Sequence, residues 1–185
     1  NIAQTVTVTG VNDVVADGNI TYTVIIGAAT SADPNYNGLN PDDIAVINID
    51  DDQAGVNVFP VSGLTTKEDG STATFQISLN TAPVSNVTIS FASSDETEGT
   101  VSPTQQVFNN TSWNSPATIT ITGVDDLAED GDQPYTVTIS SASSDPNYNN
   151  LSIPSVSVTN LDDTKPRAAD DAATTPEKDP VQVDV

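Results

Sequence analysis

Acidic side chains are the residues of this chain whose types and spacing are suited to chemistry. Their densest run ends the segment 118–132, T-I-T-I-T-G-V-D-D-L-A-E-D-G-D, in which an alternating stretch leads directly into a carboxylate-rich loop. Carboxylates within about 4–6 Å of one another disfavour each other's ionisation, and a bound divalent cation removes that conflict. Calcium suits such loops best, because it is a hard ion that takes about six to eight oxygen ligands in flexible geometry. The segment therefore indicates a Ca2+ site.

Nearly the same segment occurs earlier in the chain, at 5–19, as T-V-T-V-T-G-V-N-D-V-V-A-D-G-N. Both copies continue through Y-T-V and D-P-N-Y-N and close on a run of aspartates. Self-similarity at a fixed spacing is the signature of repeated structural units. We interpret residues 1–52 as the C-terminal half of one repeat and 53–164 as a complete repeat. Residues 165–185 are interpreted as a linker and the start of a following repeat.

The composition excludes several functions. The 185 residues include 26 acidic and 4 basic side chains, with no His and no Cys, for a net charge of −22. This charge repels nucleic acid and anionic membranes, so we expect no nucleic-acid partner. Disulfides, typical zinc sites and Cys/His catalysis are excluded by the missing residue types. No apolar run approaches the roughly 20 residues of a membrane span, so we expect no direct membrane insertion.

The elements that position the acids are predicted to be strands. Residues 5–9, 22–26 and 44–46 alternate with period two, and no segment shows a helical period. The chain is therefore predicted to be all-β. In the complete repeat the alternation predicts seven strands, at 56–61, 72–79, 86–92, 100–108, 117–122, 135–141 and 155–161. Seven short strands separated by turn residues are typical of an antiparallel immunoglobulin-like β-sandwich. The fold class is thus tandem sandwiches, the first of them incomplete.

The same alternation predicts which side chains point inward. Trp113, in a loop between two strands, is expected to cover one end of the core. The inward candidates are Phe75, Ile77, Leu79, Val87, Ile89, Phe91, Ile119, Ile121, Tyr135, Val137, Ile139, Val156 and Val158.

Chain reversal sorts the acids to one end of the sandwich. Consecutive antiparallel strands place their loops alternately at two poles, and the acidic loops fall together. Two of the opposite loops contain no acid and the third offers only Asp145. Solubility explains an acidic surface in general, but it does not require sorting by pole. The acids of the acidic pole are Glu68, Asp69, Asp95, Glu96, Glu98, Asp125, Asp126, Glu129, Asp130, Asp132, Asp162 and Asp163.

These motifs resemble a known family. Glu68 followed by Gly70 and Phe75, the carboxylates after 86–92, T-G-V-D-D and the terminal aspartates look like a Calx-β domain. The match is closest to the tandem Calx-β-like repeats of large bacterial surface and adhesin-like proteins. The resemblance implies β-sandwiches that bind calcium at one pole, near the junction with the next domain.

The resemblance also implies a set of ligands. The loop spacing is not that of the helix–loop–helix calcium site, so ligands would be collected from separate loops. In the complete repeat they are Glu68, Asp95 or Glu98, Asp125, Asp126, Asp130, Asp162 and Asp163, with Asp132 as a further candidate. In the partial copy they are Asp13, Asp17, Asp50, Asp51 and Asp52. The tail after Ala168 is similar to the entry of bacterial cadherin-like or immunoglobulin-like repeats, the alternative being an acidic linker.

The expected function is structural. We expect a calcium-binding spacer or filament segment of a secreted or bacterial cell-surface, adhesin-like protein. Its partners would be neighbouring repeats, and other copies or surface glycans as further candidates. Catalysis is not expected, because the paired carboxylates mark a domain junction and sugar-holding aromatics are sparse. Strand-exchange assembly of an extracellular fibre is one alternative. Another is recognition of glycan or protein through Asn109, Asn110, Trp113, Asn147, Tyr148 and Asn149.

Overall fold

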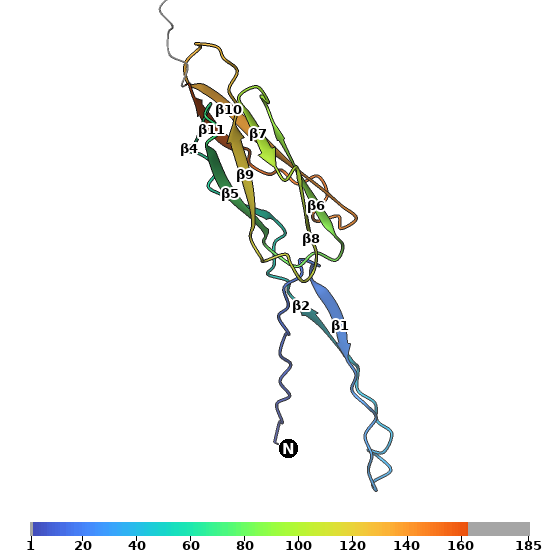
Figure 1. Cartoon of the computed structure of the whole chain (residues 1–185). Coiled ribbons are helices and arrows are strands. Elements are labelled where there is room, and N and C mark those ends of the chain that lie inside the picture. The colour runs from blue at the N-terminus through green and yellow to red at the C-terminus, as the bar shows by residue number, and fades with distance from the viewer. Residues whose placement is uncertain (1, 163–185) are drawn as a thin grey trace, which may run out of the picture.

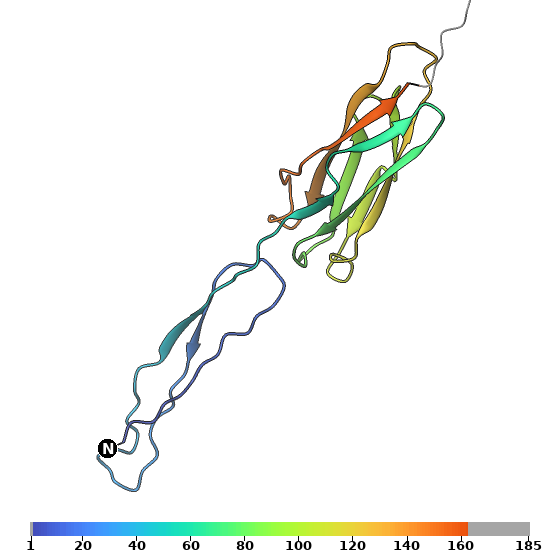
Figure 2. The ribbon, with the colours of Figure 1, turned by 90° about the vertical axis from the view of Figure 1, so that its left-hand side faces the viewer.

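The structure is a computed structural model that describes residues 2–162. A β-sandwich follows a two-stranded sheet, and the two lie end to end (Figures 1 and 2). The described residues contain no helix, and accordingly none that is long and apolar enough to cross a membrane. The predictions for Asp163 and for residues 165–185 lie outside the described residues.

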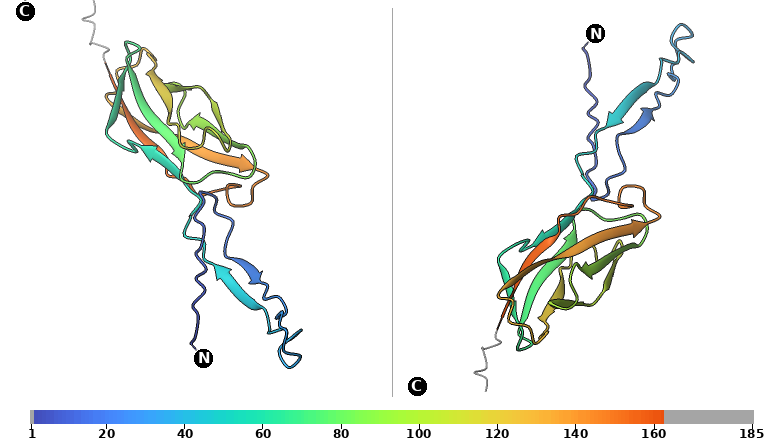
Figure 3. Two further views of the ribbon diagram at one scale, coloured as in Figure 1. Left: turned by 90° about the horizontal axis from the view of Figure 1, so that it is seen from below. Right: turned by 90° about the horizontal axis from the view of Figure 1, so that it is seen from above.

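Two sheets form the sandwich, which occupies residues 56–161 (Figure 3). Neighbouring strands are antiparallel except β4 and β11, which are parallel. The first sheet has the order β4(Leu64–Lys67), β11(Val156–Leu161), β10(Gln133–Ser143), β6(Val87–Ser93) and β8(Gln105–Phe108). The second has the order β3(Val56–Phe59), β5(Thr72–Leu79), β9(Ala117–Gly123) and β7(Gly99–Ser102). The prediction of an all-β, immunoglobulin-like sandwich is confirmed.

One predicted strand is wrong as a single strand, and one observed strand was not predicted. The strand predicted at 56–61 is observed as β3, and the chain then crosses to form the unpredicted β4 in the other sheet. The stretch predicted at 100–108 divides into β7 and β8, one in each sheet. Pro60 and Pro103 stand at the two interruptions. Proline has no backbone N–H to donate to a ladder, so the strand stops there and the chain can change sheets.

The core between the sheets consists of the predicted inward side chains. All thirteen are buried, and Phe75 meets Phe91 edge to face with 5.9 Å between ring centroids. Phe108 and Tyr148 join them although the alternation did not single them out. Trp113 packs against the core from the loop before β9, as expected. Alternation alone therefore identifies most of the buried surface, because the period of a strand is two.

The segment before the sandwich forms a smaller sheet. Strands β1(Ile20–Val24) and β2(Ile44–Asn48) pair antiparallel. The strand predicted at 5–9 is wrong: these residues are exposed and belong to no ladder. Their counterpart in the sandwich is β9, which lies between β5 and β7. Among residues 2–162 no such neighbours flank 5–9, so the hydrogen bonds that define a strand are missing.

Residues matched by the sequence repeat pair in the same register. Strand β1 pairs with β2 as β10 pairs with β11, and both pairs are antiparallel. The matched pairs are Tyr22–Val46 with Tyr135–Val158, Val24–Ile44 with Val137–Val156, and Ile20–Asn48 with Gln133–Asn160.

The end of the sandwich that faces this smaller sheet is closed by Tyr148. Its side chain is 1% exposed, and its hydroxyl donates to the carbonyl of Thr81 at 2.8 Å. The backbone N–H of Thr81 donates to the same hydroxyl at 3.1 Å. Asp145, also buried, accepts from the N–H groups of Val84 and Asn147 at 2.9 Å each. Tyr148 is therefore a structural residue, and its expected place among recognition contacts is wrong because it has no exposed surface to offer.

Replacing Tyr148 with phenylalanine is expected to lower the free energy of unfolding of the sandwich by about 1–3 kcal/mol, because buried partners lose their hydrogen bonds. Tyr36 is its repeat counterpart and is 61% exposed, so Tyr36→Phe is the matched control and should change stability by less than about 0.5 kcal/mol. Urea unfolding followed by Trp113 fluorescence measures both. Equal effects of the two substitutions contradict this assignment.

Candidate metal centre

Three carboxylates meet at one end of the sandwich. This end, where the loop between β9 and β10 lies, is the one away from the two-stranded sheet (Figure 1). Glu68 follows β4, and Asp126 and Asp130 lie in the loop between β9 and β10. One carboxylate oxygen from each lies within 4.8 Å of the other two. Oxygens that bind one calcium ion at about 2.3–2.6 Å must lie within about 5 Å of one another. The group therefore meets the distance requirement for sharing an ion.

The two sides of this group differ in exposure. Glu68 is only 5% exposed, whereas Asp126 and Asp130 are exposed on a loop. A buried carboxylate backed by the sandwich supplies a fixed ligand, and the loop supplies two that can adjust. This arrangement suits calcium, whose coordination is flexible, better than magnesium, which demands near-ideal octahedral geometry.

Backbone hydrogen bonds fix the segments that carry the acids. The N–H of Glu68 donates to the carbonyl of Leu161 at 3.3 Å, which joins the end of β4 to the end of β11. The N–H of Val124 donates to the carbonyl of Glu98 at 3.0 Å, which joins the end of β9 to the loop before β7. Four segments that are far apart in the sequence thus converge on one pole, as chain reversal predicts.

Glu98 is 6% exposed and lies close enough to Asp126 and Asp130 for their charges to act on its carboxyl group. Burial raises the pKa of its carboxyl, and the charges of Asp126, Asp130 and Asp95 act in the same direction. A hydrogen bond from Asn160 Nδ2 to Glu98 Oε2, at 3.2 Å, opposes the rise by stabilising the ionised form. A cation at this pole would likewise favour the ionised carboxylate.

Asn160 organises the interior of the pole and was not among the predicted site residues. Besides Glu98, its Nδ2 donates to the carbonyl of Val124 at 3.0 Å. Its Oδ1 accepts from the hydroxyl of Thr66 at 2.9 Å, and Thr66 lies 3.2 Å from the Tyr135 hydroxyl. The signal for Asn160 was present in the sequence, because an asparagine precedes the terminal aspartates in both copies.

The other candidates of this pole shape turns instead of joining the group. Asp95 Oδ1 accepts from the N–H and the hydroxyl of Thr97, at 3.0 and 2.5 Å, and these bonds lower the pKa of Asp95. One oxygen of Asp125 accepts the N–H of residue 127 at 2.9 Å. Asp132 Oδ1 accepts the N–H of Asp162 at 3.2 Å. Each of these carboxylates keeps a second oxygen.

The acids of the partial copy gather around one hollow. Asn12, Asp13, Asp17, Gly18, Asp50, Asp51 and Asp52 are among its lining residues. Partial desolvation, followed by the charges of the neighbouring acids, raises the pKa of Asp52. Within residues 2–162, however, the Glu68 group is the sole set of three carboxylates at ligand spacing. The structure thus brings these acids together without placing their oxygens as closely.

The two acidic loops share a hydrogen-bond pattern. Gly18 N–H donates to Asp50 Oδ2 at 2.6 Å, as Gly131 N–H donates to Asp162 Oδ2 at 3.0 Å. Both glycines have positive φ, 81° and 78°, a conformation that glycine adopts without strain. The amide of Asn48 donates to the carbonyl of residue 11 at 3.0 Å, which repeats the bond that Asn160 makes. The loops are therefore built alike.

The acidic loop of the partial copy also touches the sandwich. The N–H of Ala82 donates to the carbonyl of Val14 at 2.7 Å. The side-chain amide of Asn147 donates to the carbonyl of Ala16, also at 2.7 Å. Both contacts lie where the two bodies meet (Figure 2). The loop that carries Asp13 and Asp17 is thus the joint between the bodies.

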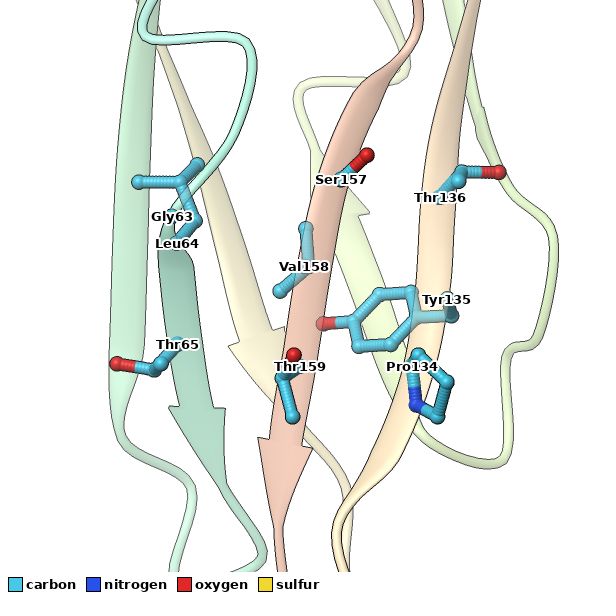
Figure 4. Close-up of a pocket in the computed structure, with 9 residues that line it drawn as sticks. All are labelled: Gly63, Leu64, Thr65, Pro134, Tyr135, Thr136, Ser157, Val158 and Thr159. Carbon is cyan, nitrogen blue, oxygen red and sulfur yellow. The ribbon is translucent and has the colours of Figure 1, made fainter.

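A second hollow lies on the outer face of the five-stranded sheet (Figure 4). Its titratable side chain is that of Tyr135, whose hydroxyl is bonded to buried Thr66, and no carboxylate lines it. The hollow therefore offers no pair of groups for acid–base chemistry. Its lining consists of Gly63, Leu64, Thr65, Pro134, Tyr135, Thr136, Ser157, Val158 and Thr159.

Comparisons with known proteins give weak likenesses. No protein-family model matches the chain, and no curated protein matches its sequence. Among solved structures, the apo form of the Calx CBD1 domain is 14% identical, with 60% of this chain and 99% of that chain covered and a TM-score of 0.44. SSP-19, an MSP-domain protein of Caenorhabditis elegans, is 10% identical, with 57% and 98% covered and a TM-score of 0.43.

A third likeness extends over more of the chain. Domains 4 and 5 of the S-layer protein SbsC are 17% identical, with 80% of this chain and 77% of that chain covered and a TM-score of 0.35. Likenesses this weak identify neither a family nor a function for this chain.

Proposed function

We propose that this chain is a calcium-binding structural repeat, a stiffened spacer segment of a secreted or bacterial cell-surface multi-repeat protein. The observation that carries the proposal is the group formed by Glu68, Asp126 and Asp130 at one end of the sandwich. Buried Glu98, on which the charges of Asp126 and Asp130 act, and the shared bonding pattern of the two acidic loops support it. The role is non-catalytic.

A second ion, held by the corresponding acidic loop of the partial copy, would act on the joint between the two bodies. Loop 12–18 carries carboxylates on one side and docks through the carbonyls of Val14 and Ala16 on the other. A cation that holds Asp13, Asp17 and Asp50 together restricts this loop and therefore the orientation of the sandwich bonded to it. Without an ion, mutual repulsion of the carboxylates favours a looser loop. Calcium would then set the stiffness of the joint.

The calcium affinity that we expect for such a site fits a location outside the cell. Calcium sites of extracellular modules bind with dissociation constants of about 10⁻⁴–10⁻³ M, which suits an ion that is continuously present outside cells. We expect the exposed acidic loops of this chain to belong to this weak and reversible class. Neighbouring repeats are the proposed partners, since the joint is formed between consecutive parts of one chain.

Titration calorimetry of the full chain with CaCl₂ tests the proposal. We expect saturable binding, weaker binding of MgCl₂, and loss of one site in Asp126→Asn. Asp42→Asn is the matched control, because it removes the same charge from an exposed loop outside both acidic poles. Absence of saturable calcium binding, or equal losses in the two variants, contradicts the proposal.

A further inference from the structure

The loop D-P-N-Y-N occurs once in each copy, at 33–37 and at 145–149. In both, Oδ1 of the aspartate accepts the backbone N–H of the first asparagine at 2.9 Å. Oδ1 of the last asparagine accepts the N–H of the serine two residues before the loop, at 3.1 Å in the partial copy and 3.3 Å in the sandwich. The two loops are therefore shaped alike, by bonds in which the side-chain amide of the first asparagine takes no part.

That side-chain amide has a different partner in each copy. Asn35 Nδ2 donates within its own loop, to Asp33 Oδ1 at 3.0 Å. Asn147 Nδ2 donates instead to the carbonyl of Ala16 at 2.7 Å, in the acidic loop 12–18. The loop with Asn147 lies where the two bodies meet, whereas the loop with Asn35 lies at the distant end of the two-stranded sheet (Figure 2). Loops of one shape thus differ in this bond, and the difference is the acidic loop beside Asn147.

The acidic loop offers backbone groups to the sandwich. Asp13 Oδ1 accepts the N–H of Val15 at 2.9 Å, and the N–H of Asp17 donates to the carbonyl of Val15, also at 2.9 Å. The turn fixed in this way carries the carbonyls of Val14 and Ala16, which are the two groups that the sandwich bonds. Recognition of carbonyls depends on the path of the backbone and not on the side chains of the loop.

The acidic loop of the sandwich follows the same plan with other side chains. Asp126 Oδ1 accepts the N–H of Ala128 at 2.9 Å, which repeats the bond from Val15 to Asp13. Residues 126–130 read D-L-A-E-D, where residues 13–17 read D-V-V-A-D. A partner that bonds the backbone tolerates this difference, because the aspartate that shapes the turn is kept. One docking surface therefore fits acidic loops of different sequence.

We propose that the D-P-N-Y-N loop is the surface by which one repeat recognises the acidic loop of the repeat before it, and that the amide of Asn147 determines the specificity of this contact. A neutral donor suits the position, because the hollow at the joint is also lined by Asp50 and Asp52. A carboxylate at 147 would face like charges and a carbonyl acceptor. The proposal rests on the repeat arrangement of the proposed function and not on its calcium ion.

Hydrogen exchange of the Ala82 amide in the full chain tests the proposal, because this N–H donates to the carbonyl of Val14 across the joint. Asn147→Asp keeps the shape of the side chain, removes the donor and adds a charge. We expect the Ala82 amide to exchange at least about fivefold faster in this variant, since docking then opens more often. NMR relaxation should also give β1 and β2 a rotational correlation time distinct from that of the sandwich.

Matched variants locate the effect at the joint. Asn35→Asp makes the same change in the loop of the same shape away from the joint, and should alter Ala82 exchange by less than about twofold. Asn147→Ala removes the donor without adding charge and should accelerate Ala82 exchange at least about threefold. The Leu79 amide, which donates to the carbonyl of Trp113 inside the sandwich, reports unfolding of the sandwich itself and should keep its rate.

Three results overturn the proposal: an unchanged Ala82 rate in either Asn147 variant, equal acceleration in Asn35→Asp, and acceleration of Leu79 to the same degree as Ala82. The measurements are made in EGTA and in CaCl₂, and the effect of Asn147→Asp is expected in both. An effect confined to CaCl₂ contradicts the proposal, because the contact would then depend on the ion. A chain that binds no calcium but shows the effect in EGTA contradicts the calcium role and supports this inference.

Discussion

Replacing Gly123 with alanine is expected to destabilise the sandwich by about 3 kcal/mol and to weaken calcium binding at the same time. A Cβ on Gly123 would lie 2.1 Å from the carbonyl oxygen of Lys67 and 2.7 Å from Asn160 Oδ1. The first of these atoms belongs to the backbone of β4, so the overlap cannot be relieved by a rotamer change, and overpacking of this kind typically costs 1–3 kcal/mol or more. Because Lys67 precedes Glu68, the displacement also moves Glu68, the buried carboxylate of the proposed site.

Two measurements separate the effects of Gly123→Ala. Urea unfolding followed by Trp113 fluorescence gives the stability, and calcium titration under conditions where the variant is folded gives the affinity. Gly27→Ala is the control, since a Cβ on Gly27 meets nothing within 4 Å. A variant that is destabilised but binds calcium as tightly as the original chain would show that the position of Glu68 does not set the affinity.

The sequence predicted the core well because a strand has a strict period of two. Every inward candidate from Phe75 to Val158 is buried, whichever strand boundaries are used. Strand boundaries were predicted less well because they depend on where the hydrogen-bond ladder can continue. Pro60 and Pro103 end ladders in the middle of apolar alternation, and only the sheet geometry shows that the chain then changes sheets. The prediction of a strand at 5–9 was wrong for a related reason. An alternating sequence does not by itself provide the neighbouring strand with which a ladder forms.

The clustering of acids at one pole was predictable from the topology. Which of these carboxylates lie at ligand spacing was not. Antiparallel reversal brings Glu68, Asp126 and Asp130 together from loops far apart in the sequence. The same argument gave no means of separating them from Asp95, whose carboxylate caps a turn through Thr97. Short-range bonds between an aspartate and the residue two positions later are common in turns. Asn160 was missed because an asparagine becomes informative only when its buried partners are seen.

Removing calcium is expected to lower the melting temperature of the sandwich by about 2–6 °C. An ion that binds only the folded state adds RT ln(1 + [L]/Kd), which at 1 mM calcium is about 0.4 kcal/mol for a dissociation constant of 10⁻³ M and about 1.4 kcal/mol at 10⁻⁴ M. Each kcal/mol shifts the melting temperature of a domain of this size by about 4 °C or more. Thermal melts in 1 mM CaCl₂ and in EGTA, followed by Trp113 fluorescence, measure the shift.

General screening of a strongly acidic chain would also raise the melting temperature, so coordination must be distinguished from it. NaCl at matched ionic strength supplies the screening alone and should reproduce little of the calcium effect. Asp126→Asn/Asp130→Asn gives the sharper contrast. Because it removes two of three crowded carboxylates, the variant should be at least as stable as the original chain in EGTA, yet gain little from calcium. A variant that loses stability in EGTA, or that still responds fully to calcium, would show that these carboxylates do not hold the ion.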